Sequence, residues 1–507
     1  MTPLSRKLLK KPGRWNDMKR IITLILCCSF LLPGCMVGPD YEQPMVDALD
    51  AWRISPKEAA DTANTAWWKQ FQDPVLHDLI NAALLGNKDV RIAAARMEQF
   101  MAQVEITRSG FYPQVGYGLG GSRNQASKNI LPSGVESLSS TYQATLNAGW
   151  ELDVWGRLHR ATEAAQADLL AAEEGRRTVI LSLVSSVATG YITLRGLDAQ
   201  LEIAKNTVKS RKDSLDLFEL QFEGGVISQL TLAQVRSEYE QALAAVPEIE
   251  RQITQTENLL SLLLGRNPGS IQRGLPIEKL TLASIPAAIP SSVLERRPDI
   301  LQAEQNLIAA NALIGVARAE YFPNISLTGL AGVASGDLSN LFEKDSFVWS
   351  IGGDAFGAIF TGGRISAGVK QSEAYYKELL FSYQQSILTA FREAEDALVT
   401  TQKAREKLQA QARRVKALGD YASLARLRYD NGYSSYIEVL DAERSLFDSE
   451  LNAVRTQSEV IIGMINTYKA MGGGWIMLAE DAANTVDFPA KEESESENGS
   501  EYGNGSK

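Results

Sequence analysis

The sequence has 507 residues, 45% of them hydrophobic and 22% charged, a composition that excludes a wholly disordered chain and supports a large packed structure. The net charge is −10, and the chain is more acidic still without its basic N-terminal region, which argues against a nucleic-acid partner. There are only two histidines and three cysteines, and we find no nucleotide-binding glycine loop. We therefore expect no enzyme, no catalytic residue, no metal site and no cofactor beyond a covalent lipid.

The first segment, residues 1–34, has the features of a secretory signal peptide. Basic residues precede the apolar run IITLILCCSFLLPGC, which is too short to span a bilayer, and translation can start at Met1 or at Met18. The run ends in LPGC, which resembles the lipobox of bacterial lipoproteins and implies cleavage before Cys35 and lipid attachment to its thiol. The alternative is an ordinary signal peptide with an incidental cysteine. Because Met36 follows the cysteine in place of an aspartate, the resemblance implies the outer membrane.

An internal duplication occupies most of the remaining chain. Residues 89–115 align without gaps with residues 299–325. Further along the chain the spacing between the two copies changes by a few residues and then stays constant, so that glycines such as Gly225 and Gly432 match. Such spacing is the signature of two copies of one structural unit. We predict an N-terminal extended segment over 35–74, a first repeat over 75–275, a linker over 276–295, a second repeat over 296–478 and a disordered acidic tail over 479–507.

Each copy contains two stretches in which apolar and polar residues alternate. The first copy has FYPQVGYGLGG and TYQATLNAGWEL, and the second has YFPNISLTGLAGV and FVWSIGGDAFGAIF. Alternation over about ten residues, with aromatic residues near the ends, is typical of transmembrane β-barrel strands. The predicted strands lie at about 111–123, 140–152, 321–334 and 346–360.

A soluble sandwich with one buried face is the alternative for these strands, since alternation does not distinguish lipid from a protein core. Four strands form only a small sandwich, however, and here they come as two hairpins far apart in the chain. Four strands also cannot close a membrane barrel. If the strands cross a membrane, several chains must share one barrel.

Long helices account for most of the rest. After a shorter helical stretch at about 75–109, two proline-free segments repeat apolar residues at three-four spacing, and each is long enough for a helix of about 100 Å. Each turns at a glycine, Gly225 or Gly432, and returns through a shorter helix, as in antiparallel coiled coils. The long helices are predicted at about 157–222 and 365–429, and the returning helices at about 230–265 and 437–472.

This combination of features resembles the TolC/OprM-like outer-membrane efflux proteins, known as the NodT family. Local motifs agree with the resemblance from Cys35 to about Trp475: CMVGPDYEQP, WWKQFQDPVLHDLI, WELDVWGRL, SVATGYITLRG, LLLGRNP, LERRPDI and YKAMGGGW. The proline before Gly34 in the lipobox and the long acidic tail depart from the family pattern.

The resemblance implies a mostly α protein with a transmembrane β-barrel: a homotrimer with a twelve-stranded barrel in outer-membrane lipid and a periplasmic α-barrel of long helical hairpins. It implies an exit channel that passively conducts drugs or other small toxic molecules. The partners implied are a periplasmic adaptor (membrane fusion) protein and an inner-membrane RND-type transporter. The alternative is a periplasmic coiled-coil scaffold or tether lipoprotein without a channel, which needs no alternating aromatic strands.

The resemblance also assigns functional residues near the two glycine turns, which it implies are periplasmic tips that dock the adaptor. The positions matching Ile437, Asp441 and Arg444 line the closed periplasmic gate in OprM-like members. Asp441 and Arg444 share a helix face, and a solvated intrahelical pair is the alternative for them. The first copy has Leu230, Gln234 and Ser237 at the equivalent positions, so a charged ring would come from the second copy only. The predicted tip residues are Gly224, Gly225, Val226, Gly432 and Tyr433.

Overall fold

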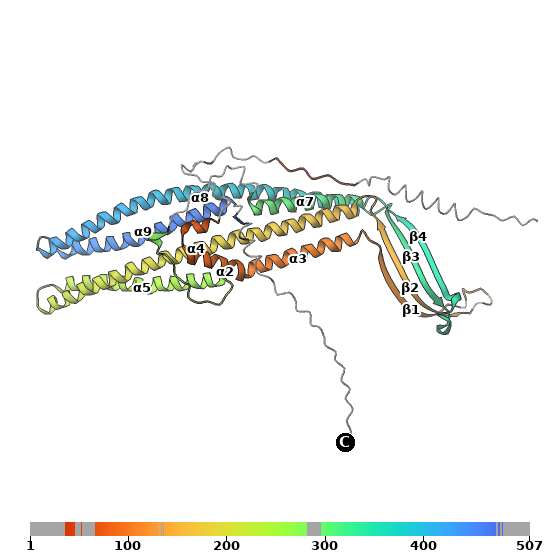
Figure 1. The fold of residues 1–507 in the computed structure, drawn as a ribbon, viewed down its shortest axis with the longest axis horizontal. Helices are drawn as coiled ribbons and strands as arrows, with labels where there is room; N and C mark the ends of the chain where they lie inside the picture. Colours follow the sequence, from red (N-terminus) through yellow and green to blue (C-terminus); the bar gives the residue numbers. More distant parts are fainter. Residues whose placement is uncertain are drawn as a thin grey trace, which may run out of the picture. The chain divides into compact units, whose positions relative to one another are not determined.

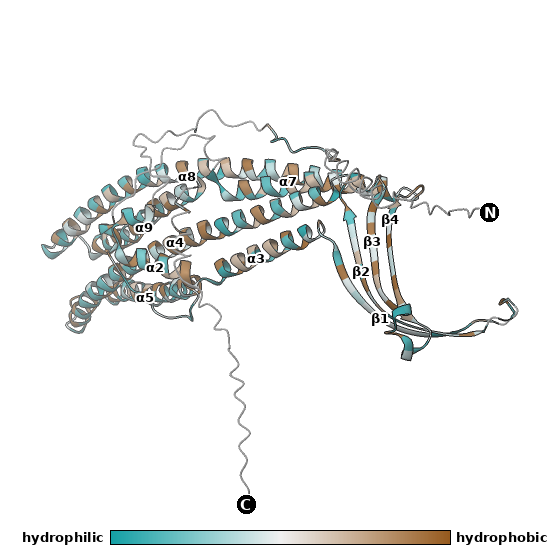
Figure 2. Cartoon of the chain, turned by 45° about the vertical axis from the view of Figure 1, so that its right-hand side comes forward, coloured by the Kyte–Doolittle hydropathy of each residue, from teal (hydrophilic) through white to brown (hydrophobic). Residues whose placement is uncertain are grey.

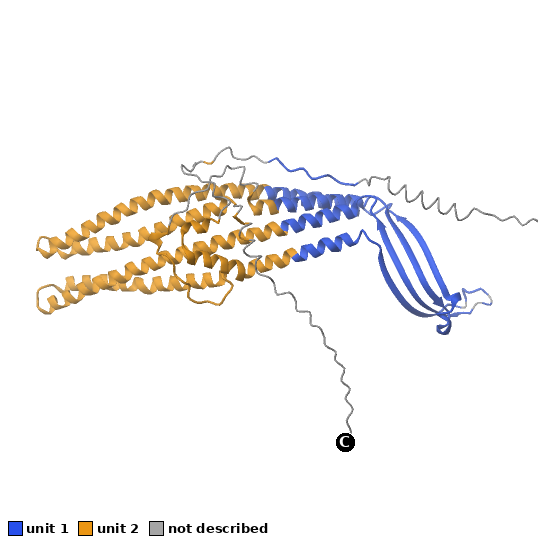
Figure 3. Cartoon of the chain, in the orientation of Figure 1, with its two compact units in different colours: residues 1–45, 98–171, 303–383 blue, residues 46–97, 172–302, 384–507 orange. Residues whose placement is uncertain are grey.

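The computed structural model describes residues 36–45, 52, 66–127, 129–132, 134, 136–280, 296–472, 475–476 and 479. The predicted signal peptide, Cys35, most of the predicted linker and the acidic tail after Ala479 lie outside the described residues. Two compact units are present, and each draws on both copies of the repeat (Figure 3). Unit 1 includes residues 98–171 and 303–383, and unit 2 includes residues 172–302 and those from 384 onward.

Unit 1 contains a four-stranded antiparallel sheet in the order β1-β2-β3-β4, so the two predicted hairpins are joined through β2 and β3 (Figure 1). Strand β1 begins at Gln114 rather than at about 111, because Phe111 and Tyr112 still continue the turn that ends the preceding helix. Their N–H groups donate to the carbonyls of Arg108 and Ser109. The strands are β1 (Gln114–Gln125), β2 (Leu138–Leu152), β3 (Asn324–Ser335) and β4 (Phe347–Phe356).

The register gives the sheet one apolar face and one mostly polar or glycine-rich face. Residues directly opposite one another on neighbouring strands point to the same face. Figure 2 shows that apolar residues recur along the strands. Three successive rows on one face are Val115–Ala148–Gly329–Ile351, Tyr117–Leu146–Ala331–Trp349 and Leu119–Ala144–Val333–Phe347. Two rows on the opposite face are Gln114–Gly149–Thr328–Gly352 and Gly116–Asn147–Leu330–Ser350.

Two helical hairpins provide most of unit 2, and each long helix also contributes residues to unit 1. The long helices have 67 residues each, which corresponds to about 100 Å, and the returning helices have 35 residues each. The equal lengths confirm that the fold is duplicated. The first hairpin is α4 (Arg157–Glu223) with α5 (Gln229–Leu263), and the second is α8 (Arg364–Asp430) with α9 (Tyr436–Ala470).

The helical stretch predicted at 75–109 is two helices, α2 (Pro74–Gly86) and α3 (Lys88–Ser109), with Asn87 between them. The side chain of Asn87 caps α3, since its Oδ1 accepts from the N–H groups of Asp89 and Val90. Its amide also donates to the carbonyl oxygen of Leu263 at 2.9 Å, so the break is fixed by the end of α5. In the second copy, α7 (Pro298–Ala319) is the counterpart of α3.

The core of unit 2 is built around α4 and a group of aromatic side chains. One stretch of α4 is apolar enough to cross a membrane by composition, but 72% of it is buried within the protein, as expected for a core helix. The ring of Trp67, from the short helix η1 (Trp67–Phe71), stacks on Tyr468 at 5.3 Å and meets Trp475 edge-on. All three side chains are fully or almost fully buried, so the predicted WWKQF motif is a packing element.

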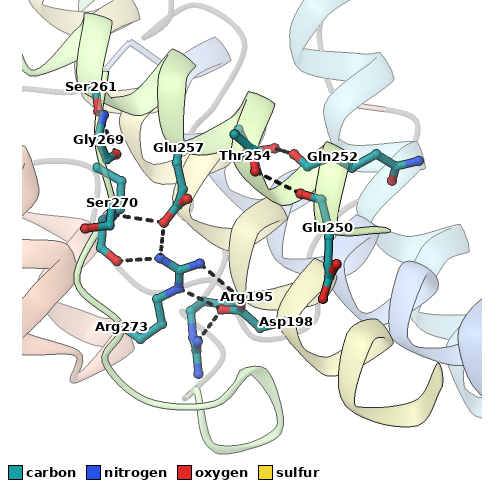
Figure 4. A network of polar contacts seen from close by, with 12 residues as sticks. Arg195, Asp198, Glu250, Gln252, Thr254, Glu257, Ser261, Gly269, Ser270 and Arg273 are labelled. Atoms are coloured by element: carbon teal, nitrogen blue, oxygen red, sulfur yellow. Dashed lines mark hydrogen bonds and ion pairs between the residues drawn. The ribbon is translucent and has the colours of Figure 1, made fainter. Parts of the chain in front are cut away.

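A polar network fixes the loop that follows α5 (Figure 4). The guanidinium group of Arg273 pairs with Asp198 on α4 at 3.1 Å and with Glu257 on α5. Arg195 donates to the carbonyl oxygen of Leu275 at 2.9 Å, so the loop is held from the side of α4 as well. The loop therefore has one defined path across the hairpin, which places Gly274 and Leu275 against the start of α2.

In unit 1, the segment Met36–Met45 is bound as an extended strap. Asp40 accepts from the buried Arg160 on α4 at 2.6 Å, and Tyr41 donates to Glu304 on α7 at 3.1 Å. Asn311 donates to the carbonyl oxygen of Pro39 at 3.0 Å. The motif VGPDYEQP that follows Cys35 is thus a set of anchoring contacts.

Candidate functional site

The two hairpins reverse direction through the same turn. Gly225 has φ +73° and Gly432 has φ +74°, in the left-handed region that only glycine adopts without strain. In the first turn the N–H of Val226 donates to the carbonyl oxygen of Gln221 at 2.8 Å, which is the long bond of a Schellman motif. Tyr433 makes the equivalent bond in the second turn. Glycine is therefore required by the backbone at both positions.

All five predicted tip residues are exposed. Val226 and Tyr433, which follow the two left-handed glycines, are 75% and 78% exposed, although both side chains are largely apolar. Gly224 precedes the first left-handed glycine and keeps a helix-like bond to the carbonyl oxygen of Leu220 at 3.0 Å. Each tip thus presents one apolar side chain to the outside, at a position set by its turn.

The helices that leave the two tips start differently. Ser228 caps α5, because its hydroxyl oxygen accepts from the N–H of Thr231 at 3.2 Å. Ser435 occupies the same position before α9 but makes no side-chain cap bond. Since a capping bond is worth about 1 kcal/mol, the first turn of α9 is held less firmly than that of α5. This first turn carries the predicted gate residue Ile437.

Behind the tips, an apolar cluster joins the two hairpins. Phe218 of α4 packs against Tyr436 of α9 with ring centroids 4.2 Å apart, and Tyr436 also meets Tyr429 of α8 edge-on at 4.9 Å. Burying such rings is the main force holding one hairpin to the other. The buried members are Leu215, Phe218, Val235, Ala425, Tyr436, Val439, Leu440 and Ala442.

Charged side chains lie next to this cluster. Arg211 of α4 pairs with Glu238 of α5 at 3.1 Å, and its guanidinium group lies 5.4 Å from the ring centroid of Phe447 on α9. Glu443 of α9 lies 3.9 Å from Arg426 of α8. Burial raises the pKa of Glu443, although both guanidinium groups act in the opposite direction. Arg211 therefore links the two hairpins, and burial disfavours the ionised form of Glu443.

The predicted gate residues line one groove of about 490 Å³. The structure brings Ile437, Asp441 and Arg444 of α9 together there with Gln234 and Ser237 of α5, two of their first-copy counterparts. The groove thus lies between equivalent helices of the two copies. Its other lining residues are Glu238, Tyr421, Glu438 and Leu440.

Asp441 and Arg444 form an ion pair within one chain. Arg444 Nη2 lies 3.0 Å from Asp441 Oδ1, and both side chains are about half exposed, at 50% and 53%. A pair so open to solvent contributes about 1 kcal/mol or less to stability. Ile437, one turn before Asp441, is 56% exposed. Within a single chain this is a solvated face, so a gate at these residues requires other copies of the chain; its assignment stays a prediction.

Sequence reasoning missed Arg211 and Glu443, which it had no reason to separate from other charged helix positions. The duplication offered a signal. Glu443 and Arg426 correspond to Arg236 and Glu219 of the first copy, so the pair has its charges exchanged between the copies. The first-copy pair is closed, at 2.7 Å. A charge exchange at equivalent positions indicates that the two residues meet across a hairpin.

Together, a strand set with one apolar face and two long helical hairpins with glycine tips define an outer-membrane channel protein. Residues 79–266 and 289–473 match the family described as Outer membrane efflux protein, and the chain belongs to this family. It is an outer-membrane exit channel of an efflux system, with a tunnel in the periplasm. The predicted family, fold class, function and location are therefore confirmed, and the family consists of channels rather than enzymes.

Relatives named as efflux pump outer membrane proteins match nearly the whole chain. The chain is 35% identical over 466 residues to the probable efflux pump outer membrane protein TtgC of Pseudomonas putida, which covers 90% of this chain and 96% of that protein. It is 37% identical over 461 residues to the solvent efflux pump outer membrane protein SrpC of the same species, covering 89% and 98%. The CmeC outer membrane channel of Campylobacter jejuni superposes with a TM-score of 0.82 at 26% identity, covering 90% and 99%.

Proposed function

We propose that three copies of this chain form one channel that conducts small toxic molecules, such as drugs or solvents, out of the periplasm. In this proposal an inner-membrane RND-type transporter supplies the energy and a periplasmic adaptor protein connects it to the channel. The names of the relatives support the cargo class, since SrpC is described as part of a solvent efflux pump. The exposed apolar residues Val226 and Tyr433 support the tips as the adaptor-docking surface.

The main support for a trimer comes from the two open edges of the sheet. Strands β1 and β4 are its two edges, and each has one side with no partner strand among the described residues. Exposed strand edges in a membrane are too costly to persist, because their backbone groups find no water there. Pairing β1 of one copy with β4 of the next satisfies both edges, and three copies give a closed barrel of twelve strands. The apolar rows then face outer-membrane lipid.

A scaffold or tether without a channel is the second candidate, and the sheet disfavours it. A periplasmic tether has no use for rows of exposed Tyr117, Trp349 and Ile351, each more than 60% exposed in the chain. Such a face would promote aggregation in water.

Native mass spectrometry of the detergent-solubilised protein is expected to give a complex of three processed chains, because only an association of several copies closes the barrel. Circular dichroism of the same sample checks that the strands are formed. A stable monomer with an intact β-sheet signal would contradict the trimer and the assignment of the strands to a barrel.

We also propose a lipid on Cys35, which lies outside the described residues. The strap that follows it supports the proposal. The N–H of Val37 donates to the carbonyl oxygen of Trp155 at 3.1 Å, and Met36 packs on Gly156 so closely that a Cβ there would lie 2.6 Å from its Cγ. Both contacts are just beyond Leu152, where β2 ends. A lipid on the preceding residue would enter the bilayer next to the strands.

Mass spectrometry of the mature N-terminus is expected to find a diacylglyceryl group on Cys35. Cys35→Ser should lower the amount of assembled protein but leave assembled channels active, because the strands themselves hold the protein in the membrane. An unmodified N-terminus produced by cleavage at a different residue would reject the lipoprotein assignment.

A further inference from the structure

A short basic stripe lies on α8, consisting of Arg413, Arg414 and Lys416. All three side chains are exposed, and within the described part of the chain none of them has an ion-pair partner. Two basic residues shortly before it on the same helix are neutralised: Lys403 pairs with Glu406 at 2.9 Å and Lys407 pairs with Glu459 at 2.8 Å. The stripe is thus a concentration of uncompensated positive charge on an acidic protein.

The stripe belongs to the second copy alone. Its equivalent positions in the first copy, on α4, are Asn206, Thr207 and Lys209, with a single charge among them. Three like charges within one helical turn repel one another, so the helix gains from an acidic ligand that covers them. Duplication alone therefore does not explain the stripe.

The same chain contains a segment of opposite charge. The sequence from Lys491 to Glu501 has glutamates at 492, 493, 495, 497 and 501 and only one basic residue. This segment follows the part of the chain that matches the efflux family, which ends at residue 473. The family fold does not account for it.

The acidic segment follows the buried core of unit 2, to which α8 also contributes. Ala479 is 1% exposed and belongs to the same core cluster as Ala404 of α8. From Ala404, Arg413 lies about 14 Å further along the helix. The chain from Ala479 to Glu492 can span up to about 45 Å when extended. This length is about three times the rise along α8 from Ala404 to the stripe.

We propose that the acidic segment Glu492–Glu501 docks on the basic stripe of its own α8. The attraction is between exposed charges, so it weakens as salt screens them. The tether keeps the segment at a high local concentration, which compensates for the weakness of each pair. Any other acidic partner reaches the stripe only by displacing the segment.

A disulfide trap tests the proposal on the purified full-length protein. Ala417→Cys is exposed and next to the stripe, and Ser496→Cys lies between two glutamates, so neither substitution changes a charge. The double variant is expected to cross-link within one chain under mild oxidation, and the yield should fall several-fold in high salt. The matched control is Ser210→Cys with Ser496→Cys, since Ser210 is the first-copy equivalent of Ala417 and is also exposed.

Adding Arg413→Gln, Arg414→Gln and Lys416→Gln should reduce the cross-link to the yield of the control. Equal yields for the two cysteine pairs, a yield that does not depend on salt, or a link between two chains would overturn the proposal. A second measurement uses Ala417→Cys alone, whose reaction with a maleimide should become faster when the chain is truncated after Ala482. Unchanged protection in the truncated protein would show that something other than the acidic segment covers the stripe.

Discussion

Asp73→Ala is expected to lower the free energy of unfolding by about 3 kcal/mol or more, because the aspartate satisfies four donors in a buried place. Its Oδ1 accepts from the N–H groups of Val75 at 2.9 Å and Leu76 at 3.4 Å, which caps α2. Its Oδ2 accepts from the hydroxyl of Tyr191 at 2.7 Å and from the N–H of Leu275 at 3.0 Å. The side chain is 3% exposed, so water cannot replace it. Alanine would leave these four donors, at the start of α2 and near the loop after α5, without their acceptor.

The measurement is thermal melting of the helical signal in the purified protein, where Asp73→Ala should melt several degrees below wild type. Tyr191→Phe removes one of these four hydrogen bonds and also the bond that the Tyr191 hydroxyl accepts from the N–H of Gly274, so it should cost about 2 kcal/mol. Asp213→Ala changes an exposed aspartate on α4 and should leave the melting temperature unchanged. If Asp73→Ala melts with the Asp213→Ala control, the network around α2 does not stabilise the protein.

The long helices were predictable because their signals are local. Helix α4 was expected at about 157–222 and runs from Arg157 to Glu223. A proline-free apolar periodicity defines such a helix, and a glycine that must adopt positive φ ends it. The α5 helix continues through Pro247, so a single proline did not divide this hairpin.

The break at Asn87 was not predictable, because asparagine occurs both inside helices and at their caps. The position of the break depends on Leu263, which is far away in sequence and whose carbonyl oxygen accepts a hydrogen bond from the Asn87 side chain. The candidate site also combines features that were predictable from local sequence with features that were not. The glycine turns follow from local sequence, whereas the link from Arg211 to Phe447 depends on how the hairpins pack. The gate residues were found through the family resemblance, and the structure adds their first-copy neighbours in the groove.

Asp441→Ala combined with Arg444→Ala is expected to raise the single-channel conductance clearly above that of wild type. In the proposed trimer, three copies of α9 would converge behind the tips, and three carboxylates brought close together repel one another unless each is held by a guanidinium group. The structure provides that partner within each chain, at 3.0 Å. Each pair is worth about 1 kcal/mol or less, so three pairs bias a closed state without locking it. Ile437→Ala should increase the conductance further by removing an apolar ring.

Bilayer recordings with a matched control separate a gate from a solvated helix face. Glu248 and Arg251 on α5 form an ion pair of the same spacing, 2.6 Å long and also about half exposed, but away from the groove. Glu248→Ala with Arg251→Ala should leave the conductance at the wild-type value, and native mass spectrometry should show that every variant is still a trimer. An adaptor bound at the tips would then open the channel by favouring the splayed state over the closed one. If the Asp441, Arg444 and Ile437 substitutions also leave the conductance unchanged in intact trimers, these residues form a solvated face and the channel closes at another level.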